Sequence, residues 1–194
     1  MPRTVEIIER KTIFKKFIFV IEEATLRHEL FDGTLSAPMT RLNLERGDAI
    51  AAILHDPASD EILLVEQFRF PTFDKSGGWV VETAAGMIDT GETPADAAHR
   101  EIEEETGYRL TALKPIQTFY LTPGGSSERI HLFYGAIERA NRFGTGGGLL
   151  SEGENIREVV LPLIEAFTRL DAGGFDDAKT IIALQWMRLG KHRA

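Results

Sequence analysis

The stretch Gly86–Tyr108, GMIDTGETPADAAHREIEEETGY, decides how the chain is organised. It predicts a loop that leads into a single helix. Thr93 suits the N-terminal cap and Pro94 the first helical position, while Gly107 suits the C-terminal cap. We therefore expect a helix that begins after Thr93 and ends before Gly107.

Three acidic residues of this helix share one face. Glu105 lies four residues and Glu104 three residues after Glu101, and such positions are neighbours at 3.6 residues per turn. Like charges at this spacing destabilise an isolated helix by ~0.2–0.5 kcal/mol per pair. A hard divalent cation would offset that cost, because Mg²⁺ takes carboxylate oxygens. A solvated acidic face is the alternative, and the three glutamates alone do not exclude it.

An apolar stripe of the same helix is expected to dock on a core. Its members are Ala95, Ala98 and Ile102. Ala97 lies among the three glutamates, and its small side chain would leave room for a bound ion.

Further residues stand at fixed offsets in the stretch: Gly86, Glu92, Arg100 and Gly107. With the three glutamates they resemble the Nudix box at every fixed position, and Tyr108 stands where that family usually has an aliphatic residue. Nearly the whole chain is similar to the ADP-ribose pyrophosphatase branch of the Nudix hydrolase superfamily. The resemblance implies an α/β fold, an α/β/α sandwich with a mixed β-sheet.

Composition bounds the class of protein. The 194 residues suit one domain with a sizeable core, and the net charge is −8. No basic run appears, so we expect no nucleic-acid partner. The absence of cysteine excludes a thiol nucleophile and a zinc-thiolate site. No signal core and no apolar run near ~18 residues is present, so we expect a cytoplasmic protein without a membrane partner.

Residues 1–45 are predicted to form an N-terminal antiparallel β-region. The run Phe14–Ile21 is rich in β-branched and aromatic residues, Phe31–Gly33 reads as a turn, and a strand is expected near Met39–Leu44. The region resembles the N-terminal part of the ADP-ribose branch, where it exchanges between subunits of a homodimer and helps to build the substrate site. A hairpin packed on its own core is the alternative; we favour the homodimer.

Residues 46–194 are predicted to form the catalytic domain. Apolar runs predict its strands, at Ala49–Leu54, Glu61–Phe70, Trp79–Glu82, Ile116–Leu121, Ile130–Ile137 and Val159–Leu161. Two C-terminal helices are expected at Ile164–Asp171 and Asp177–Leu189, and loops at Pro71–Gly78 and Asn141–Gly148. His55 and His99 have no metal-ligand spacing and are interpreted as ordinary surface residues.

The resemblance implies a metal-dependent site in this domain. Glu101 and Glu105 correspond to metal ligands, Glu104 to a further or bridging ligand, and the carbonyl of Ala85 also contributes. The ions would be Mg²⁺ or Mn²⁺, about two or three per site. Arg100 would pair with Glu92 and hold the loop against the helix.

The general base is left open between two loop residues, Glu152 and Glu154. The ADP-ribose branch carries a glutamate on a mobile loop beyond the box, and Glu152–Ile156 lines up with that loop without a gap. We therefore prefer Glu152. Two solvated loop carboxylates are the alternative.

The resemblance also implies substrate contacts. Pro123 lies fifteen residues after Tyr108, a position associated with ADP-ribose hydrolysis in the superfamily. A proline-glycine turn between strands is the alternative, and the two interpretations are compatible. The glutamate that matches Glu128 contacts the terminal ribose. Arg46 and Arg69 are further candidates for contacts with phosphate or base. Phe17, contributed by the partner subunit, is a candidate for stacking on adenine.

These features imply hydrolysis of the pyrophosphate bond of ADP-ribose to AMP and ribose 5-phosphate. Another nucleoside diphosphate sugar, such as GDP-mannose, is the alternative, because Glu128–Phe133 also resembles that branch. A non-catalytic ligand sensor is a third hypothesis. It is disfavoured because all the box glutamates are present.

Overall fold

The computed structural model describes residues 3–192 and divides them into two compact units. The first contains the residues up to Asp48 together with Tyr120–Arg129, and the second contains Ala49–Phe119 and the chain from Ile130 onward. The segment Tyr120–Arg129 was assigned from the sequence to the catalytic domain. Among the described residues, no helix is long and apolar enough to cross a membrane.

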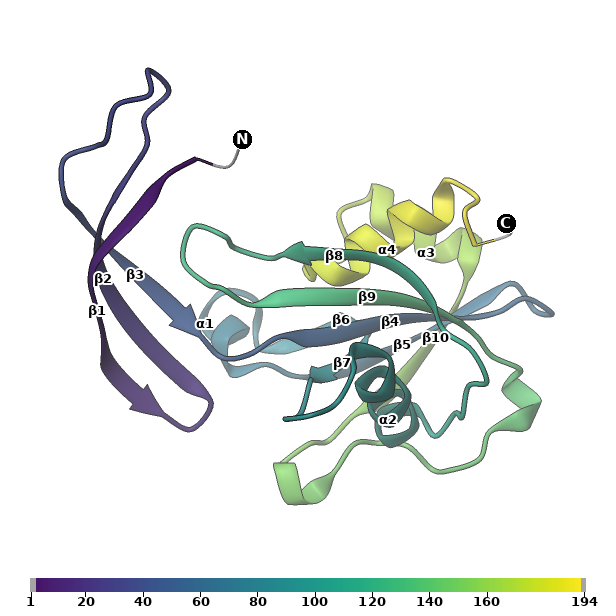
Figure 1. Ribbon diagram of the computed structural model, residues 1–194. Helices are drawn as coiled ribbons and strands as arrows, with labels where there is room; N and C mark the ends of the chain where they lie inside the picture. The colour runs from purple at the N-terminus through teal and green to yellow at the C-terminus, as the bar shows by residue number, and fades with distance from the viewer. Residues whose placement is uncertain (1–2, 193–194) are drawn as a thin grey trace. The chain divides into compact units, whose positions relative to one another are not determined.

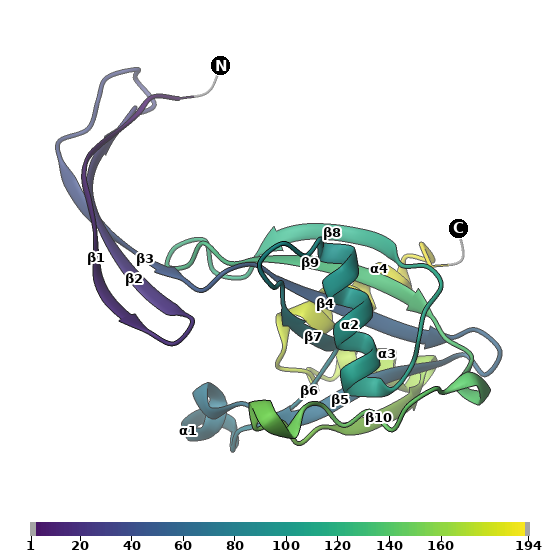
Figure 2. The same cartoon turned by 60° about the horizontal axis from the view of Figure 1, so that its bottom comes forward.

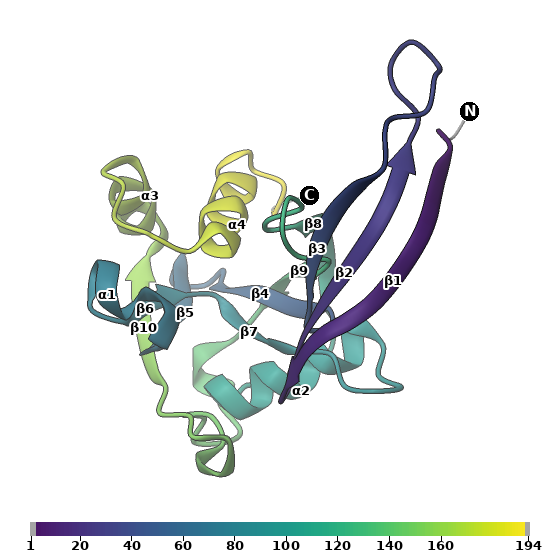
Figure 3. The same ribbon diagram turned by 90° about the vertical axis from the view of Figure 1, so that its left-hand side faces the viewer.

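The first unit is a three-stranded antiparallel sheet in the order β1-β2-β3 (Figure 3). Its strands are β1 (Val5–Lys16), β2 (Phe19–His28) and β3 (Met39–Glu45). The N-terminal antiparallel region, the turn at residues 31–33 and the strand from Met39 are confirmed.

A single strand across residues 14–21 was wrong, because the chain reverses there. Lys16 pairs with Phe19, so Phe17 and Ile18 form a two-residue hairpin turn. Phe17 adopts a φ of 53°, in the left-handed region that bulky residues rarely occupy. The turn carries none of the Gly, Asn or Asp residues that mark such hairpins in a sequence.

The second unit is built on a mixed sheet in the order β10-β5-β4-β9-β8 (Figure 1). These strands are β4 (Ala49–Asp56), β5 (Glu61–Phe68), β8 (Lys114–Tyr120), β9 (Arg129–Ala136) and β10 (Arg157–Pro162). Strand β4 runs parallel to β9 and antiparallel to β5, and two short strands add to the sheet: β6 (Trp79–Glu82) on β5 and β7 (Ala84–Met87) on β4. The predicted mixed sheet is confirmed.

Helices cover both faces of this sheet, α2 (Pro94–Thr106) on one and α3 (Leu163–Asp171) with α4 (Ala178–Arg188) on the other (Figure 1). Alternate residues of β4 face opposite ways. Ile50, Ala52 and Leu54 pack in the core under α2, whereas Ala51 and Ile53 pack in the core under α3 and α4. The three-layer α/β/α arrangement is confirmed.

Expectations about three individual side chains were wrong. His55 is only 3% exposed, because β4 extends past the predicted strand end, and its ring contacts the hydroxyl of Tyr134 at 3.1 Å and Asp60 at 3.0 Å. Ala97 lies fully buried among apolar side chains in the core under α2, while Ala95 is exposed. The helix is therefore rotated slightly from the expected stripe.

Several short elements were missed. Strand β7 was taken as part of the loop. The 3-10 turn η1 (Phe70–Thr72) begins at the predicted end of the preceding strand, and the helix α1 (Phe73–Ser76) lies within the predicted loop at 71–78. Two further 3-10 turns, η2 (Arg139–Asn141) and η3 (Leu150–Glu152), lie between β9 and β10. Each contains only three or four residues, too few to show a period in the sequence.

Candidate active site

Helix α2 has the predicted caps and lies across β4 and β7 (Figure 2). The Thr93 hydroxyl oxygen accepts a hydrogen bond from the N–H of Asp96 at 3.2 Å. At the other end, Gly107 has a φ of 73°, and its N–H donates to the carbonyl of Glu103. These local signals place the acidic residues on the turns that the sequence predicted.

Glu105 is almost completely buried between helix and sheet, with an exposed fraction of 1%. Its Oε2 accepts a hydrogen bond from the N–H of Ala85 on β7 at 3.0 Å, and its Oε1 lies 3.4 Å from the donor Nε2 of Gln67 on β5. The structure thus brings Glu105 and the backbone of Ala85 together, here through the N–H of Ala85. Gln67 was missed, because nothing in the sequence pattern sets it apart in its strand.

Glu101 is 9% exposed and lies against the backbone of Gly86. A Cβ at Gly86 would lie 1.9 Å from the carboxylate carbon of Glu101 and 1.9 Å from its Oε1. A side chain at this position would displace the carboxylate of Glu101 from the place that it occupies. The glycine of the box therefore leaves space for the side chain of a glutamate fifteen residues later.

Arg100 makes five hydrogen bonds, and three of them hold the loop against the helix. Its Nε and Nη2 donate to the two carboxylate oxygens of Glu92 at 2.9 and 3.0 Å, and Nη2 also donates to the carbonyl of Met87. Its Nη1 donates to Glu101 at 2.8 Å and to Glu104 at 3.2 Å. The hydrogen bonds from Arg100, with one from the N–H of Asp89, lower the pKa of Glu92 to about 2.

The two buried carboxyl groups are electrostatically crowded. Burial, reinforced by the charges of Glu104 and Glu154, raises the pKa of Glu101 to about 7 against the opposing effect of Arg100. Burial, reinforced by the charges of Glu101 and Glu154, raises the pKa of Glu105 to about 8. The positive charge near these two carboxyl groups is too small to offset their burial, so their pKa values stay above the ordinary value.

The residues fit a hard divalent cation by their chemistry. The donors are carboxylate oxygens, two of the three carboxylates are buried, and the missing side chain at Gly86 leaves space for the carboxylate of Glu101. In residues 3–192, no three Asp, Glu or His side chains already converge on one point as a ligand set. What supports a cation is therefore the charge and burial of the cluster.

The loop after β9 docks on the C-terminal end of α2. The N–H groups of Gly147 and Gly148 donate to the carbonyls of Glu105 and Glu104 at 2.9 and 3.0 Å. A Cβ at Gly146 would lie 2.7 Å from the carbonyl oxygen of Glu105. The glycines that the sequence indicated as flexible thus satisfy carbonyls at the end of the helix.

The two candidate bases follow this docked segment. Glu152 ends η3, and its side chain lies outside the described part of the structure. Glu154 accepts a hydrogen bond from the N–H of Leu149 at 2.9 Å, and its charge acts on both Glu101 and Glu105. The loop therefore brings Glu154 into electrostatic range of the acidic cluster.

The candidate substrate contacts divide between the units. In the second unit, the charge of Arg69 acts on Glu105, which places this guanidinium beside the acidic cluster. In the first unit, Arg46 pairs with Glu128 at 3.6 Å. Phe17 is 85% exposed at its hairpin turn, and Pro123 begins a turn.

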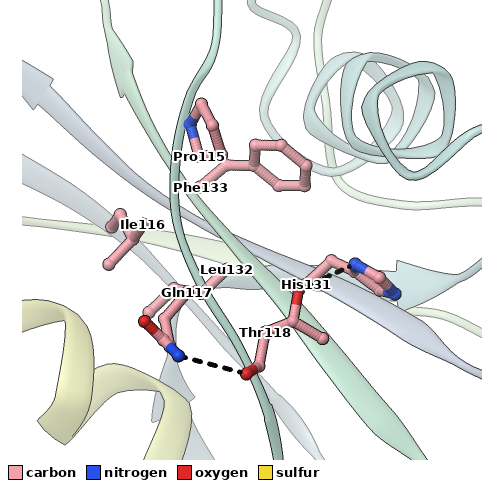
Figure 4. Close-up of a pocket in the computed structure, with 7 residues that line it drawn as sticks. All are labelled: Pro115, Ile116, Gln117, Thr118, His131, Leu132 and Phe133. Carbon is pink, nitrogen blue, oxygen red and sulfur yellow. Dashed lines mark hydrogen bonds between the residues drawn. The ribbon is translucent and has the colours of Figure 1, made fainter.

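A separate pocket of about 280 Å³ lies on β8 and β9. Figure 4 shows its lining, which contains none of the predicted site residues: Pro115, Ile116, Gln117, Thr118, His131, Leu132 and Phe133. The Thr118 hydroxyl contacts His131 Nδ1 at 3.1 Å, and no carboxylate lines the pocket. Its lining offers no counterpart to the acidic cluster on α2.

Comparison with known proteins agrees with this geometry. The chain is 39% identical over 186 residues to the ADP-ribose pyrophosphatase of Escherichia coli (strain K12), which covers 95% of this chain and 88% of the relative. It is 32% identical over 191 residues to the GDP-mannose pyrophosphatase of Cronobacter sakazakii, with 97% of each covered.

A solved structure, described as the crystal structure of ADP compounds hydrolase, matches with a TM-score of 0.75 at 20% identity. It covers 100% of this chain and 98% of its own. This match shows the fold. The NUDIX domain model matches residues 45–184, and the chain therefore belongs to the NUDIX family.

Proposed function

We propose that this NUDIX hydrolase is an ADP-ribose pyrophosphatase, which splits ADP-ribose into AMP and ribose 5-phosphate. The observation that carries the proposal is the 39% identity, over 95% of the chain, to an enzyme of that name. The site supports it, because the buried pair Glu101 and Glu105 lies on the helix that the Nudix box predicts.

Members of the family typically use divalent metals. In our proposal, Glu101, Glu105 and Glu104, with the carbonyl of Ala85, hold about two or three Mg²⁺ or Mn²⁺ ions. When bound, such ions supply charge neutralisation for the diphosphate and a water acidic enough to react near neutral pH. Glu152 or Glu154 then accepts the proton of the attacking water.

The remaining residues position the loop of the site or bind the substrate. Arg100 and Glu92 keep the loop at a fixed distance from the helix, because both carboxylate oxygens of Glu92 are engaged. Arg69 binds a phosphate beside the acidic cluster. In the first unit, the proposed contacts to the rest of the substrate are Arg46, Pro123, Glu128 and Phe17.

We also propose that the protein is a homodimer formed through the three-stranded sheet of the first unit. Large apolar side chains of this sheet are exposed, among them Val5, Ile7, Phe17 and Leu42, and exposed apolar patches mark interaction sites. Sedimentation equilibrium should give twice the mass of the 21.6 kDa chain. A species of single-chain mass at micromolar concentration would contradict the dimer.

The function is tested by a substrate panel with and without Mg²⁺. We expect AMP release from ADP-ribose only with the metal, and a kcat/KM for ADP-ribose at least about tenfold above that for GDP-mannose, because one unsatisfied polar contact suffices for such a ratio. The same panel tests the alternative that the 32% identity to a GDP-mannose pyrophosphatase favours. A preference for GDP-mannose would reject our assignment, and tight ADP-ribose binding without turnover would indicate a sensor.

A further inference from the structure

Arg69 follows β5 and offers unused hydrogen-bond donors beside the acidic cluster. Its Nε donates to Glu82 Oε1 at 2.7 Å. Neither Nη group donates to any residue that the structure describes, and the side chain is 40% exposed. A guanidinium held through Nε alone keeps both Nη groups for an anion, and this planar fork matches a phosphate.

Glu82, the partner of Arg69, is a buried carboxylate between two cations. Lys179 Nζ donates to the second oxygen, Glu82 Oε2, at 3.0 Å and to Asp177 Oδ1 at 2.6 Å. The network thus contains two acidic and two basic groups. Burial lowers the pKa of Lys179, but the charges of Glu82 and Asp177 outweigh burial and raise it above its ordinary value, so Lys179 stays protonated.

The network is anchored in the core of the second unit. Asp177 caps the N-terminus of α4, and its Oδ2 accepts hydrogen bonds from the N–H and the hydroxyl of Thr180. The Thr180 hydroxyl oxygen in turn accepts from the N–H of Thr83, the residue after Glu82, at 2.8 Å. Lys179 and Glu82 therefore lie on two elements that are joined by a buried hydrogen bond, the start of α4 and the end of β6.

We propose that Lys179 is a positioning residue for Arg69, acting through Glu82. By occupying Glu82 Oε2, Lys179 leaves only Oε1 for Arg69, which then pairs through Nε and keeps both Nη groups for a substrate phosphate. Without Lys179, the free oxygen would attract an Nη group into the two-point pair that arginine and carboxylate favour. This inference rests on the proposed function, because it assigns the phosphate contact to Arg69.

The first test is Lys179→Met, which removes the charge and keeps the length of the side chain. We expect the KM for ADP-ribose to rise about tenfold, the loss of roughly one charge-assisted hydrogen bond, while kcat changes less than about threefold. Lys179→Arg should keep KM within about threefold of the original. The matched control is Lys191→Met, which removes an exposed lysine shortly after the same helix and should change neither constant.

A double variant separates positioning from a structural effect. Glu82→Gln in the Lys179→Met background keeps an acceptor for Arg69 Nε but removes the charge that attracts Nη, so KM should fall back toward the original value. A KM that stays raised in the double variant would overturn the proposal. An unchanged KM in Lys179→Met alone would do the same.

A crystal structure of Lys179→Met tests the inference independently of activity. We expect Arg69 to contact both oxygens of Glu82. If Arg69 still pairs through Nε alone, positioning by Lys179 is rejected even if ADP-ribose is the substrate. If the wild type fails to hydrolyse ADP-ribose while the variant shows the two-point pair, the proposed function fails and the positioning stands.

Discussion

Glu101→Gln and Glu105→Gln should each lower the kcat of magnesium-dependent AMP release by at least about a thousandfold. Each change keeps the shape of the side chain and removes one buried carboxylate that we propose as a metal ligand. Losing about 4 kcal/mol of transition-state stabilisation corresponds to that factor, and a divalent metal site contributes several kcal/mol. The assay is release of AMP under saturating Mg²⁺, and calorimetric titration with Mg²⁺ should show weaker binding in both variants.

Two further variants control this prediction. Glu103 lies on the same helix but forms an exposed ion pair with Arg109. Exposed ion pairs contribute little to stability, so the activity of Glu103→Gln should stay within about threefold of wild type. Gly86→Ala keeps every glutamate but places a Cβ 1.9 Å from the carboxylate of Glu101, and should lose activity like Glu101→Gln. Full activity of both glutamine variants would remove the metal assignment.

Glu152→Gln should lower kcat by about 10²- to 10⁴-fold, the usual contribution of a general base. Glu154→Gln should lower it by less than about tenfold, because the Glu154 carboxylate already accepts the N–H of Leu149 and an amide oxygen can replace that acceptor. Single-turnover measurements under saturating Mg²⁺ compare the chemical step in the two variants.

The pair of variants is its own control, because both residues lie on the same loop and lose the same charge. If Glu154→Gln shows the larger loss, Glu154 is the base. If neither variant loses more than about tenfold, the base lies outside this loop. Magnesium affinity should be unchanged in Glu152→Gln, which distinguishes loss of a base from loss of a ligand.

Local sequence signals determined the frame of the site. Thr93 and Gly107 predicted both ends of the helix correctly, because capping residues act on the backbone of the adjacent turn. The spacing of the box predicted which glutamates share a face, and the pairing of Arg100 with Glu92, implied by the resemblance, is present. The box was readable without a structure because its parts lie within 23 consecutive residues.

The tertiary structure alone decided how buried these groups are and what surrounds them. Gln67 reaches Glu105 from another strand, and Lys179 reaches Glu82 across 97 residues of chain. The burial of His55 and the hairpin turn at Phe17 also escaped the sequence pattern. Helix caps and side-chain spacing depend on neighbours along the chain, whereas desolvation and long-range ion pairs depend on which elements pack together, and packing overrides local preference.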